Sequence, residues 1–182
     1  MIAVGQAINS LQKGDLDSAR VQIQRLPAGK DRSFLSFAMA KRIVEKGDVQ
    51  GGRIAINSGL ADARRTDGSV KASLLLMGSE LTCGIDFPAG LSILSEALNV
   101  INGFDSNLDE PLRFDRFVRV RLGSQSATFS TDVSGFKLGS VRGAFKAPIS
   151  RDPNGVLTLI LHLKNEYMRS SALLAFMSEL TS

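Results

Sequence analysis

Apolar residues along most of this chain recur every three or four positions, which is the spacing of amphipathic helices. In the first clear example, Leu16, Ala19, Ile23 and Leu26 share one helical face, and Pro27 follows where the pattern stops. The chain is therefore predicted to be mainly α-helical. Six further segments show the same spacing, with predicted apolar faces at Phe34, Leu35, Ala38, Met39 and Ile43; Ile54, Ile56 and Leu60; Val70, Leu74, Leu75 and Met77; Phe87, Leu91, Leu94, Ala97, Leu98 and Ile101; Val156, Leu157, Ile160 and Leu163; and Met168, Ala172, Leu173, Phe176, Met177 and Leu180.

A short phrase ending in aspartate precedes several of these helices. Lys13-Gly14-Asp15 returns as Lys46-Gly47-Asp48, and looser versions contain Asp86 and Asp152, so the aspartates are 33, 38 and 66 residues apart. Aspartate is a preferred residue at the start of a helix, and a period in the thirties is typical of stacked helical hairpins. The sequence thus predicts antiparallel helical hairpins stacked as a short α-solenoid, in which a helix A follows each phrase and a helix B comes after it.

Helix B is predicted to begin after a second cap, at Asp31, Asp67 and Asn165. When Lys30 is laid over Lys164, Ala38 falls on Ala172. Small residues allow helices to approach closely, so we expect both alanines to be buried where helices cross.

Glycines inside a predicted helix A at Gly51, Gly52 and Gly59 are unusual, because each costs about 1 kcal/mol relative to alanine. Close helix packing would explain them, and so would a frayed helix start.

The repeat is interrupted between residues 104 and 139. Apolar and basic residues alternate from Phe117 to Leu122, which predicts a strand with Val118, Val120 and Leu122 facing the protein. A turn and a return strand follow, so a β-hairpin is expected near 116–131. Ser140 is then predicted to cap a short helix that ends at Pro148.

Three regions follow from these patterns. Residues 1–103 are predicted to be helical repeats, 104–139 a loop and β-hairpin insertion, and 140–182 the final helical repeat. The chain would begin and end on a helix B, so we expect apolar residues to be exposed at both ends, and the segment to belong to a longer protein or to self-associate. These residues are Val4, Ile8 and Leu11 at the start and Leu173, Phe176 and Leu180 at the end.

The A and B pairs resemble tetratricopeptide-type α-solenoids at the level of the class, over about 150 positions. The aspartate, alanine and arginine pattern is also similar to that of bacterial helical-repeat proteins of unknown function. This resemblance implies a role in protein interaction.

Composition excludes several kinds of site. The chain of 182 residues has one cysteine and one histidine, which excludes a disulfide scaffold, a cysteine-rich zinc site and a site with several histidines. No apolar run approaches the ~20 residues that span a bilayer, and no signal peptide is recognised. The single cysteine favours a cytoplasmic location.

Few residues suggest chemistry. His162 is expected to be a structural or surface residue and Cys83 a packed or incidental one, because no orienting carboxylate or activating base lies near either in sequence. Asp15 and Asp17 alternate as in calcium loops, but capping explains them better. No catalytic residue, metal ligand or cofactor site is therefore predicted.

Four arginines, Arg113, Arg116, Arg119 and Arg121, form the one basic cluster in a chain of net charge +4. They could bind phosphate or nucleic acid, or form the solvated face of a strand. We expect a non-enzymatic protein-interaction or scaffold domain that binds a protein partner or itself. The alternative is phosphate or nucleic-acid binding through the arginine-bearing strand.

Overall fold

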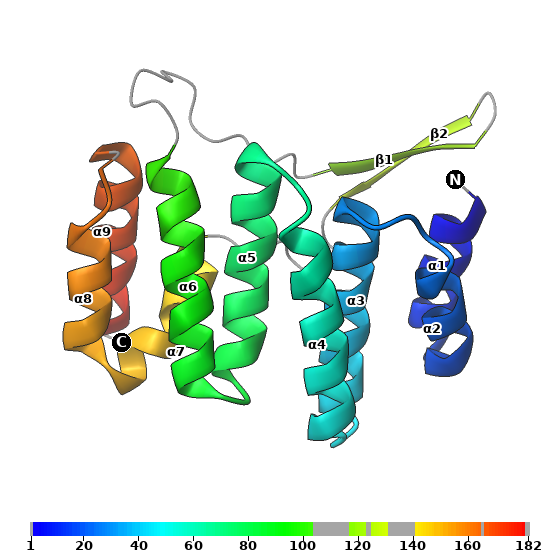
Figure 1. The fold of residues 1–182 in the computed structure, drawn as a ribbon, viewed down its shortest axis with the longest axis horizontal. Helices are drawn as coiled ribbons and strands as arrows, with labels where there is room; N and C mark the ends of the chain where they lie inside the picture. Colours follow the sequence, from blue (N-terminus) through cyan, green and yellow to red (C-terminus); the bar gives the residue numbers. More distant parts are fainter. Residues whose placement is uncertain (1, 104–116, 123–124, 131–140, 165, 181–182) are drawn as a thin grey trace. The chain divides into compact units, whose positions relative to one another are not determined.

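Nine helices and a pair of strands make up the residues that this computed structural model describes, which are 2–103, 117–122, 125–130, 141–164 and 166–180 (Figure 1). This confirms the prediction of a mainly α-helical chain with antiparallel helix pairs. In chain order the elements are α1 (Ile2–Lys13), α2 (Leu16–Gln24), α3 (Lys30–Glu45), α4 (Val49–Ala63), α5 (Gly68–Cys83), α6 (Phe87–Asn102), β1 (Phe117–Leu122), β2 (Gln125–Ser130), α7 (Val141–Arg151), α8 (Pro153–Leu161) and α9 (Glu166–Leu180).

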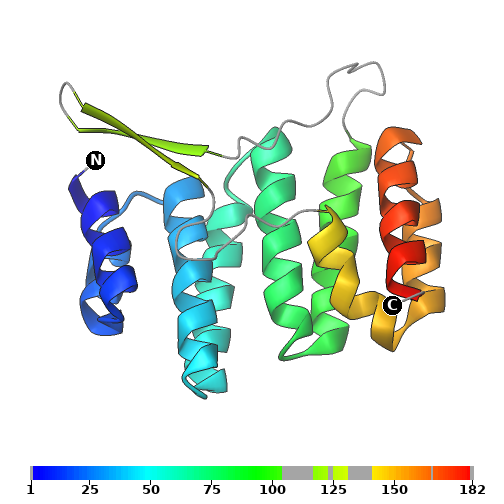
Figure 2. The ribbon, with the colours of Figure 1, turned by 180° about the vertical axis from the view of Figure 1, so that it is seen from behind.

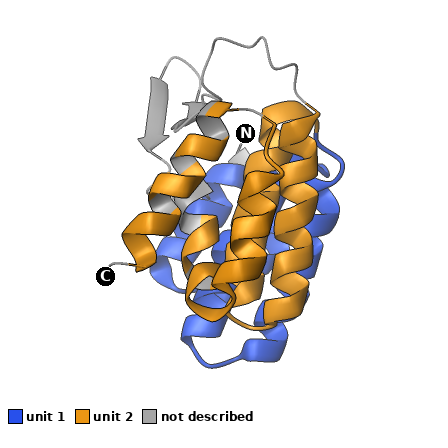
Figure 3. Cartoon of the chain, turned by 90° about the vertical axis from the view of Figure 1, so that its left-hand side faces the viewer, with its two compact units in different colours: residues 1–66, 114–138 blue, residues 67–113, 139–182 orange. Residues whose placement is uncertain are grey.

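The chain divides into two compact units, which Figure 3 shows in separate colours. Unit 1 comprises residues 1–66 and 114–138, and unit 2 comprises 67–113 and 139–182. The boundary between Thr66 and Asp67 falls inside the range 1–103 that the sequence predicts as one stretch of helical repeats.

Helix α3 is the most deeply buried helix of unit 1. It packs against α1, α2 and α4, and residues 33–40 are buried without interruption. The predicted apolar face included Phe34 and Leu35, but the structure also buries Phe37, Ser33 and Ser36. One apolar face was therefore too narrow a prediction, because neighbours cover α3 on more than one side.

Unit 2 is built around α5, which packs against α6 and α7 and is buried from 72 to 79. Helix α9 packs against α7 and α8, which lie on either side of it in Figure 2. Pro148 lies inside α7, so the prediction that the helix ends there was wrong. Phe145 and Ile149 are buried on either side of Pro148, and this burial offsets the hydrogen bond that proline cannot donate. Ser140, the predicted cap, lies outside the described residues.

The four repeated aspartates all cap a helix in the same way. Each side chain accepts a hydrogen bond from the backbone N–H three residues later, at distances of 2.7–3.2 Å. The donors to Asp15, Asp48, Asp86 and Asp152 are Ser18, Gly51, Ala89 and Gly155. The repeated phrase is thus a repeated helix start, as predicted.

The same spacing of buried residues, which we call the shared frame, follows each capping aspartate. The residues four and eight positions after each aspartate are buried, so every helix A turns the same face inward. The first set is Ala19, Gly52, Gly90 and Val156, and the second is Ile23, Ile56, Leu94 and Ile160.

The turns that lead into these caps differ between the units. Gly14 and Gly47 have φ angles of 74° and 89°, which an L side chain rarely adopts. The aspartate N–H after each donates to the carbonyl five residues back. Asp86 and Asp152 instead donate to the carbonyl four residues back and need no glycine before them. This explains why the phrase is looser in the second half of the chain.

The predicted caps of helix B were only partly correct. Helix α3 has Gly29 as its N-cap, and Asp31 lies within the first turn, so that prediction was wrong. Asp67 is the N-cap of α5, but its side chain makes no cap hydrogen bond. Asn165 lies outside the described residues.

A pair of hydrogen bonds fixes how the helix B segments align. Arg32 Nη1 donates to the Leu26 carbonyl at 3.2 Å, and Arg169 Nη1 donates to the Leu163 carbonyl at 3.1 Å. Arg169 is therefore the counterpart of Arg32, 137 residues later, which is also the distance from Asp15 to Asp152.

The predicted alignment of Ala38 with Ala172 was consequently wrong by three residues. Three residues are nearly one helical turn, so periodicity alone does not distinguish the two alignments. Both alanines are nevertheless buried, as expected.

Strands β1 and β2 fall within the range 116–131. They pair antiparallel, with Val118 opposite Phe129 and Val120 opposite Ala127. The predicted directions of the side chains of these strands lie outside what the structure describes.

The expectation of exposed apolar residues at both ends was partly wrong. Ile8 and Leu11 are buried because α1 packs against α2 and α3, and Phe176 is also buried. Leu180 is exposed, as predicted. Ile54 is exposed although it was placed on an apolar face, because α4 packs on α3 through other residues.

Candidate interaction surface

The interface between α3 and α4 shows how tightly these helices pack. A Cβ added to Gly59 would lie 2.6 Å from Cε1 of Phe37, and one added to Gly52 would meet the Val44 side chain. The Ser33 hydroxyl donates to the Gly59 carbonyl at 2.8 Å. Close packing therefore explains Gly52 and Gly59, and a frayed helix start does not.

A partly buried ion pair joins the same two helices. The Arg32 guanidinium donates from Nε and Nη2 to the two carboxylate oxygens of Asp62, at 2.6 and 2.7 Å. The hydrogen bond with Asp62 raises the pKa of Arg32, and Asp62 is only 2% exposed. The fork geometry and the third bond to the Leu26 carbonyl indicate that this pair fixes the position of α4 on α3 and of the preceding turn.

Cys83 is buried at the end of α5, where Gly90 of α6 approaches it closely. Burial raises the pKa of its thiol to about 11. The thiol is therefore protonated near neutral pH and is a packing residue, as expected.

His162 ends α8, and its backbone is tied to α6. The Asn102 side chain donates to the His162 carbonyl at 3.0 Å and accepts from the Lys164 N–H at 2.8 Å. The imidazole Nδ1 lies 2.6 Å from the Thr158 carbonyl, which can only accept, so Nδ1 carries the proton. The Asn102 bonds are to backbone atoms and the imidazole is exposed, so His162 fits the structural or surface residue that the sequence predicted.

The structure describes only part of the predicted arginine cluster. Arg119 and Arg121 lie in β1, opposite Thr128 and Ser126 of β2. Arg113 and Arg116 lie outside the described residues, so the cluster is not assembled by what the structure describes.

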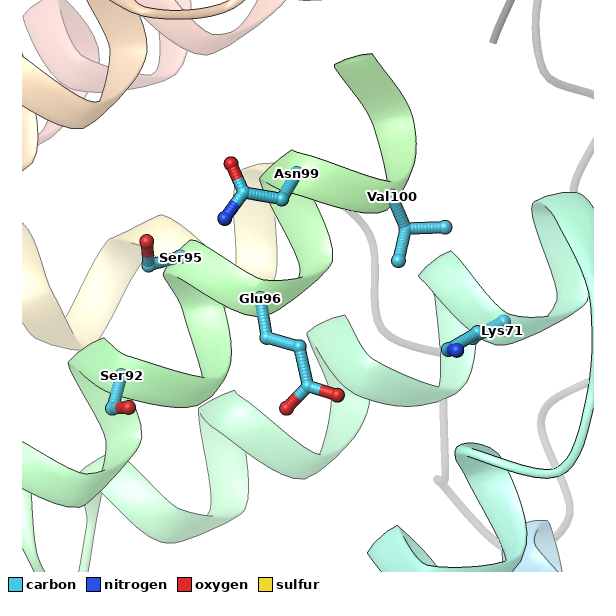
Figure 4. Close-up of a pocket in the computed structure, with 6 residues that line it drawn as sticks. All are labelled: Lys71, Ser92, Ser95, Glu96, Asn99 and Val100. Atoms are coloured by element: carbon cyan, nitrogen blue, oxygen red, sulfur yellow. The ribbon is translucent and has the colours of Figure 1, made fainter. Parts of the chain in front are cut away.

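A polar groove runs between α5 and α6 in unit 2 (Figure 4). It has a volume of about 640 Å³ and opens to solvent. Lys71 comes from α5, and α6 contributes Ser92, Ser95, Glu96, Asn99 and Val100. Sequence reasoning missed this groove, although its serines and Glu96 recur at the spacing of a polar helical face. Its lining contains one cation and one anion but no histidine that could activate a serine. The groove therefore resembles an ordinary hydrated surface and shows no catalytic group.

Helix α9 exposes large apolar side chains along one side. Leu174 is 70% exposed, Met177 63% and Leu180 57%, whereas Ala172 and Phe176 are buried. Ser170, one turn before Leu174, is also exposed. We call Ser170, Leu174, Met177 and Leu180 the α9 face. The sequence from Ser170 to Ser178 contains no charged residue, so the face is uncharged along most of its length.

Charged residues lie beside the α9 face. Lys146 of α7 and Glu179 form an ion pair at 3.8 Å, and Arg169 and Glu166 form another at 3.8 Å. An apolar patch with a polar rim is the usual composition of a protein-binding surface. Of its apolar members, the sequence predicted only Leu180 to be exposed, and it placed Met177 on the buried side of the helix.

Comparison with protein-family models, curated proteins and solved structures gave no match for this chain. Among the helices of the described residues, none is long and apolar enough to cross a membrane. In the same part of the chain, no three histidine, cysteine, aspartate or glutamate side chains are grouped so as to hold a metal ion.

Proposed function

We propose that this protein is a non-enzymatic scaffold that binds another protein through the α9 face. The observation that carries the proposal is the exposure of Leu174, Met177 and Leu180 along one helix. Exposed apolar side chains are individually ordinary, but a contiguous uncharged row of large ones marks a binding surface.

The architecture we propose is a tetratricopeptide-like helical repeat of the bacterial type, interrupted by a β-hairpin. The repeated aspartate caps and the buried positions that follow them support this, because both units contain them. Repeat proteins of this kind commonly bind through helical surfaces. The structural roles of Cys83 and His162 are consistent with a binding protein.

Site-specific cross-linking tests the proposal. A photo-reactive amino acid is placed at Ser170, on the edge of the α9 face, and as a control at Asn57, an exposed residue of α4. In the cells that produce the protein, we expect cross-links to a distinct protein from position 170 but not from position 57.

The double variant Leu174→Glu/Met177→Glu should abolish the cross-link from position 170. The matched control is Val49→Glu/Ile54→Glu, which places the same two charges on exposed apolar residues of α4. Circular dichroism checks that both variants are folded. Identical cross-links from positions 170 and 57, or a cross-link unaffected by the α9 variant, would contradict the proposal.

Phosphate or nucleic-acid binding through β1 is the second candidate. Arg119 and Arg121 are two residues apart in a strand, where alternate residues lie about 7 Å apart on one side. Binding of a labelled oligonucleotide at two salt concentrations tests this candidate, because affinity that depends on phosphate contacts falls steeply as salt rises. No binding at low salt, or no loss in Arg119→Gln/Arg121→Gln, would exclude it.

A further inference from the structure

The hairpin of α2 and α3 and the hairpin of α8 and α9 are built in the same register. Helices α2 and α8 both have nine residues and a capping aspartate. Arg32 and Arg169 make the same hydrogen bond to the carbonyl six residues before them. Residues 30–43 of α3 therefore have their counterparts in α9 137 positions later.

On α3, one side is covered by the following helix, α4. Ser33 and Phe37 both contact Gly59, through a hydrogen bond of 2.8 Å and through the Phe37 ring. Near the other end of the interface, a Cβ on Gly52 would lie 3.5 Å from the Ala40 carbonyl oxygen. Two glycines seven residues apart thus allow α4 to approach α3.

The counterparts of this side of α3 form the α9 face. Ser33, Phe37, Ala40 and Ile43 are buried on α3. Counting 137 residues on from each gives Ser170, Leu174, Met177 and Leu180. Three of the four residues of the α9 face, Ser170, Leu174 and Met177, therefore correspond to residues by which α3 receives α4.

We propose that the α9 face binds a helix of a partner protein that resembles α4. This inference rests on the function proposed above and specifies the partner. The partner helix is amphipathic, presents an uncharged side, and carries glycine or alanine at two positions seven residues apart. Met177 is larger than its counterpart Ala40, so small partner residues are needed for close approach.

A second copy of this chain does not offer such a helix among its described residues. The inward residues of α2, α4, α6 and α8 are already buried within the chain, at Ile23, Ile56, Leu94 and Ile160. Releasing one of them would expose a core. These buried residues argue against a second copy, and the occupant that we infer is a helix of a different protein.

The α4 sequence itself provides the probe. A fluorescent peptide covering residues 48–64 is stapled between positions 53 and 57, because Arg53 and Asn57 are exposed on α4 and the staple holds the peptide helical. A second peptide with the same staple carries Gly52→Leu and Gly59→Leu. Leucine favours helix, so weaker binding by this peptide cannot come from lost helicity.

Fluorescence anisotropy measures the binding of both peptides to the full chain. We expect the glycine peptide to bind, and its affinity to fall at least tenfold with Leu174→Glu/Met177→Glu but not with Val49→Glu/Ile54→Glu. The leucine peptide should bind at least tenfold more weakly than the glycine peptide. No binding, equal binding of both peptides, or indifference to the α9 variant overturns the inference.

Sedimentation of the chain alone tests the other occupant. A concentration-dependent dimer that Leu174→Glu/Met177→Glu abolishes would make a second copy the occupant and overturn the inference. The two proposals also fail separately. If cross-linking at position 170 depends on the α9 face but the glycine peptide does not bind, the interaction surface stands and the helical partner is wrong. If cross-linking does not depend on the face, the proposed function itself fails.

Discussion

Helices α3 and α9 occupy the same place in two hairpins of the same register, yet the side that is buried on α3 is exposed on α9 at Leu174 and Met177. Phe37 of α3 is fully buried beneath Gly59, whereas its counterpart Leu174 is 70% exposed. Both positions carry a large apolar residue, so the difference does not lie in these residues. The difference in burial comes from the neighbouring helix, because α4 follows α3 directly and packs against it. The comparison teaches that an apolar face is determined by its own helix, but its burial is determined by what the chain places next to it.

Truncating the two counterparts should give the largest difference. Phe37→Ala should destabilise the protein by about 3–5 kcal/mol, because it removes a buried ring and leaves a cavity at the α3–α4 interface. Leu174→Ala should change the free energy of unfolding by less than about 0.5 kcal/mol, because its side chain is mostly in water. Urea denaturation of both variants measures the difference, and equal losses would contradict the comparison.

Substitution of Gly59, which contacts Phe37, should give a smaller effect. Gly59→Ala places a Cβ 2.6 Å from Phe37 Cε1, so we expect overpacking to destabilise the protein by about 1–3 kcal/mol. Gly5→Ala in α1 is the control, since no atom lies within 4 Å of its added Cβ. That change should stabilise the helix by about 0.5–1 kcal/mol. The melting temperatures of the two variants should therefore shift in opposite directions. A stabilising effect of Gly59→Ala would contradict the close packing of Gly59 against Phe37.

The frame shared by the two hairpins could be read from the sequence. An aspartate followed by inward residues four and eight positions later is a local signal, and Asp15, Ala19 and Ile23 show it clearly. The frame does not depend on what lies beyond the hairpin. Sequence reasoning therefore identified the capped helices, although it misaligned α3 and α9 by three residues.

The candidate surface could not be predicted in the same way. Periodicity marks Leu174 and Met177 as apolar, but it does not say whether a later helix covers them. The Arg32–Asp62 pair was missed for a similar reason, because its members are 30 residues apart and nothing in the local pattern joins them. What the sequence lacks in both cases is the contact between segments, and the structure supplies it.

Removing a cap tests the frame itself. Asp152→Ala should destabilise the protein by about 1 kcal/mol, because the Gly155 N–H loses its acceptor at the start of α8. Asp67→Ala is the matched control, since Asp67 is also an N-cap but its side chain makes no cap hydrogen bond. It should cost less than about 0.5 kcal/mol. Chemical denaturation measures both, and a loss at Asp67 as large as that at Asp152 would show that the hydrogen bond is not what stabilises these starts.

The smallest expected effect is the pH dependence of the cap at Asp15, the counterpart of Asp152. Hydrogen bonds from the Ser18 hydroxyl and backbone N–H lower the pKa of the Asp15 carboxyl. A carboxyl whose pKa is lower in the folded state contributes stability above its unfolded pKa, and that contribution is lost as the pH falls through the folded pKa. Asparagine also caps helices but does not titrate, so Asp15→Asn should keep the helix start and lose this dependence. We therefore expect the stability of the wild type relative to Asp15→Asn to be constant near neutral pH and to fall below about pH 4.

Asp17→Asn removes the same charge within the first turn without changing the cap, and should retain the wild-type dependence. Denaturation midpoints of the three proteins between pH 2 and 7 measure this dependence. An unchanged difference between wild type and Asp15→Asn across that range would show that the Asp15 cap contributes no pH-dependent stability.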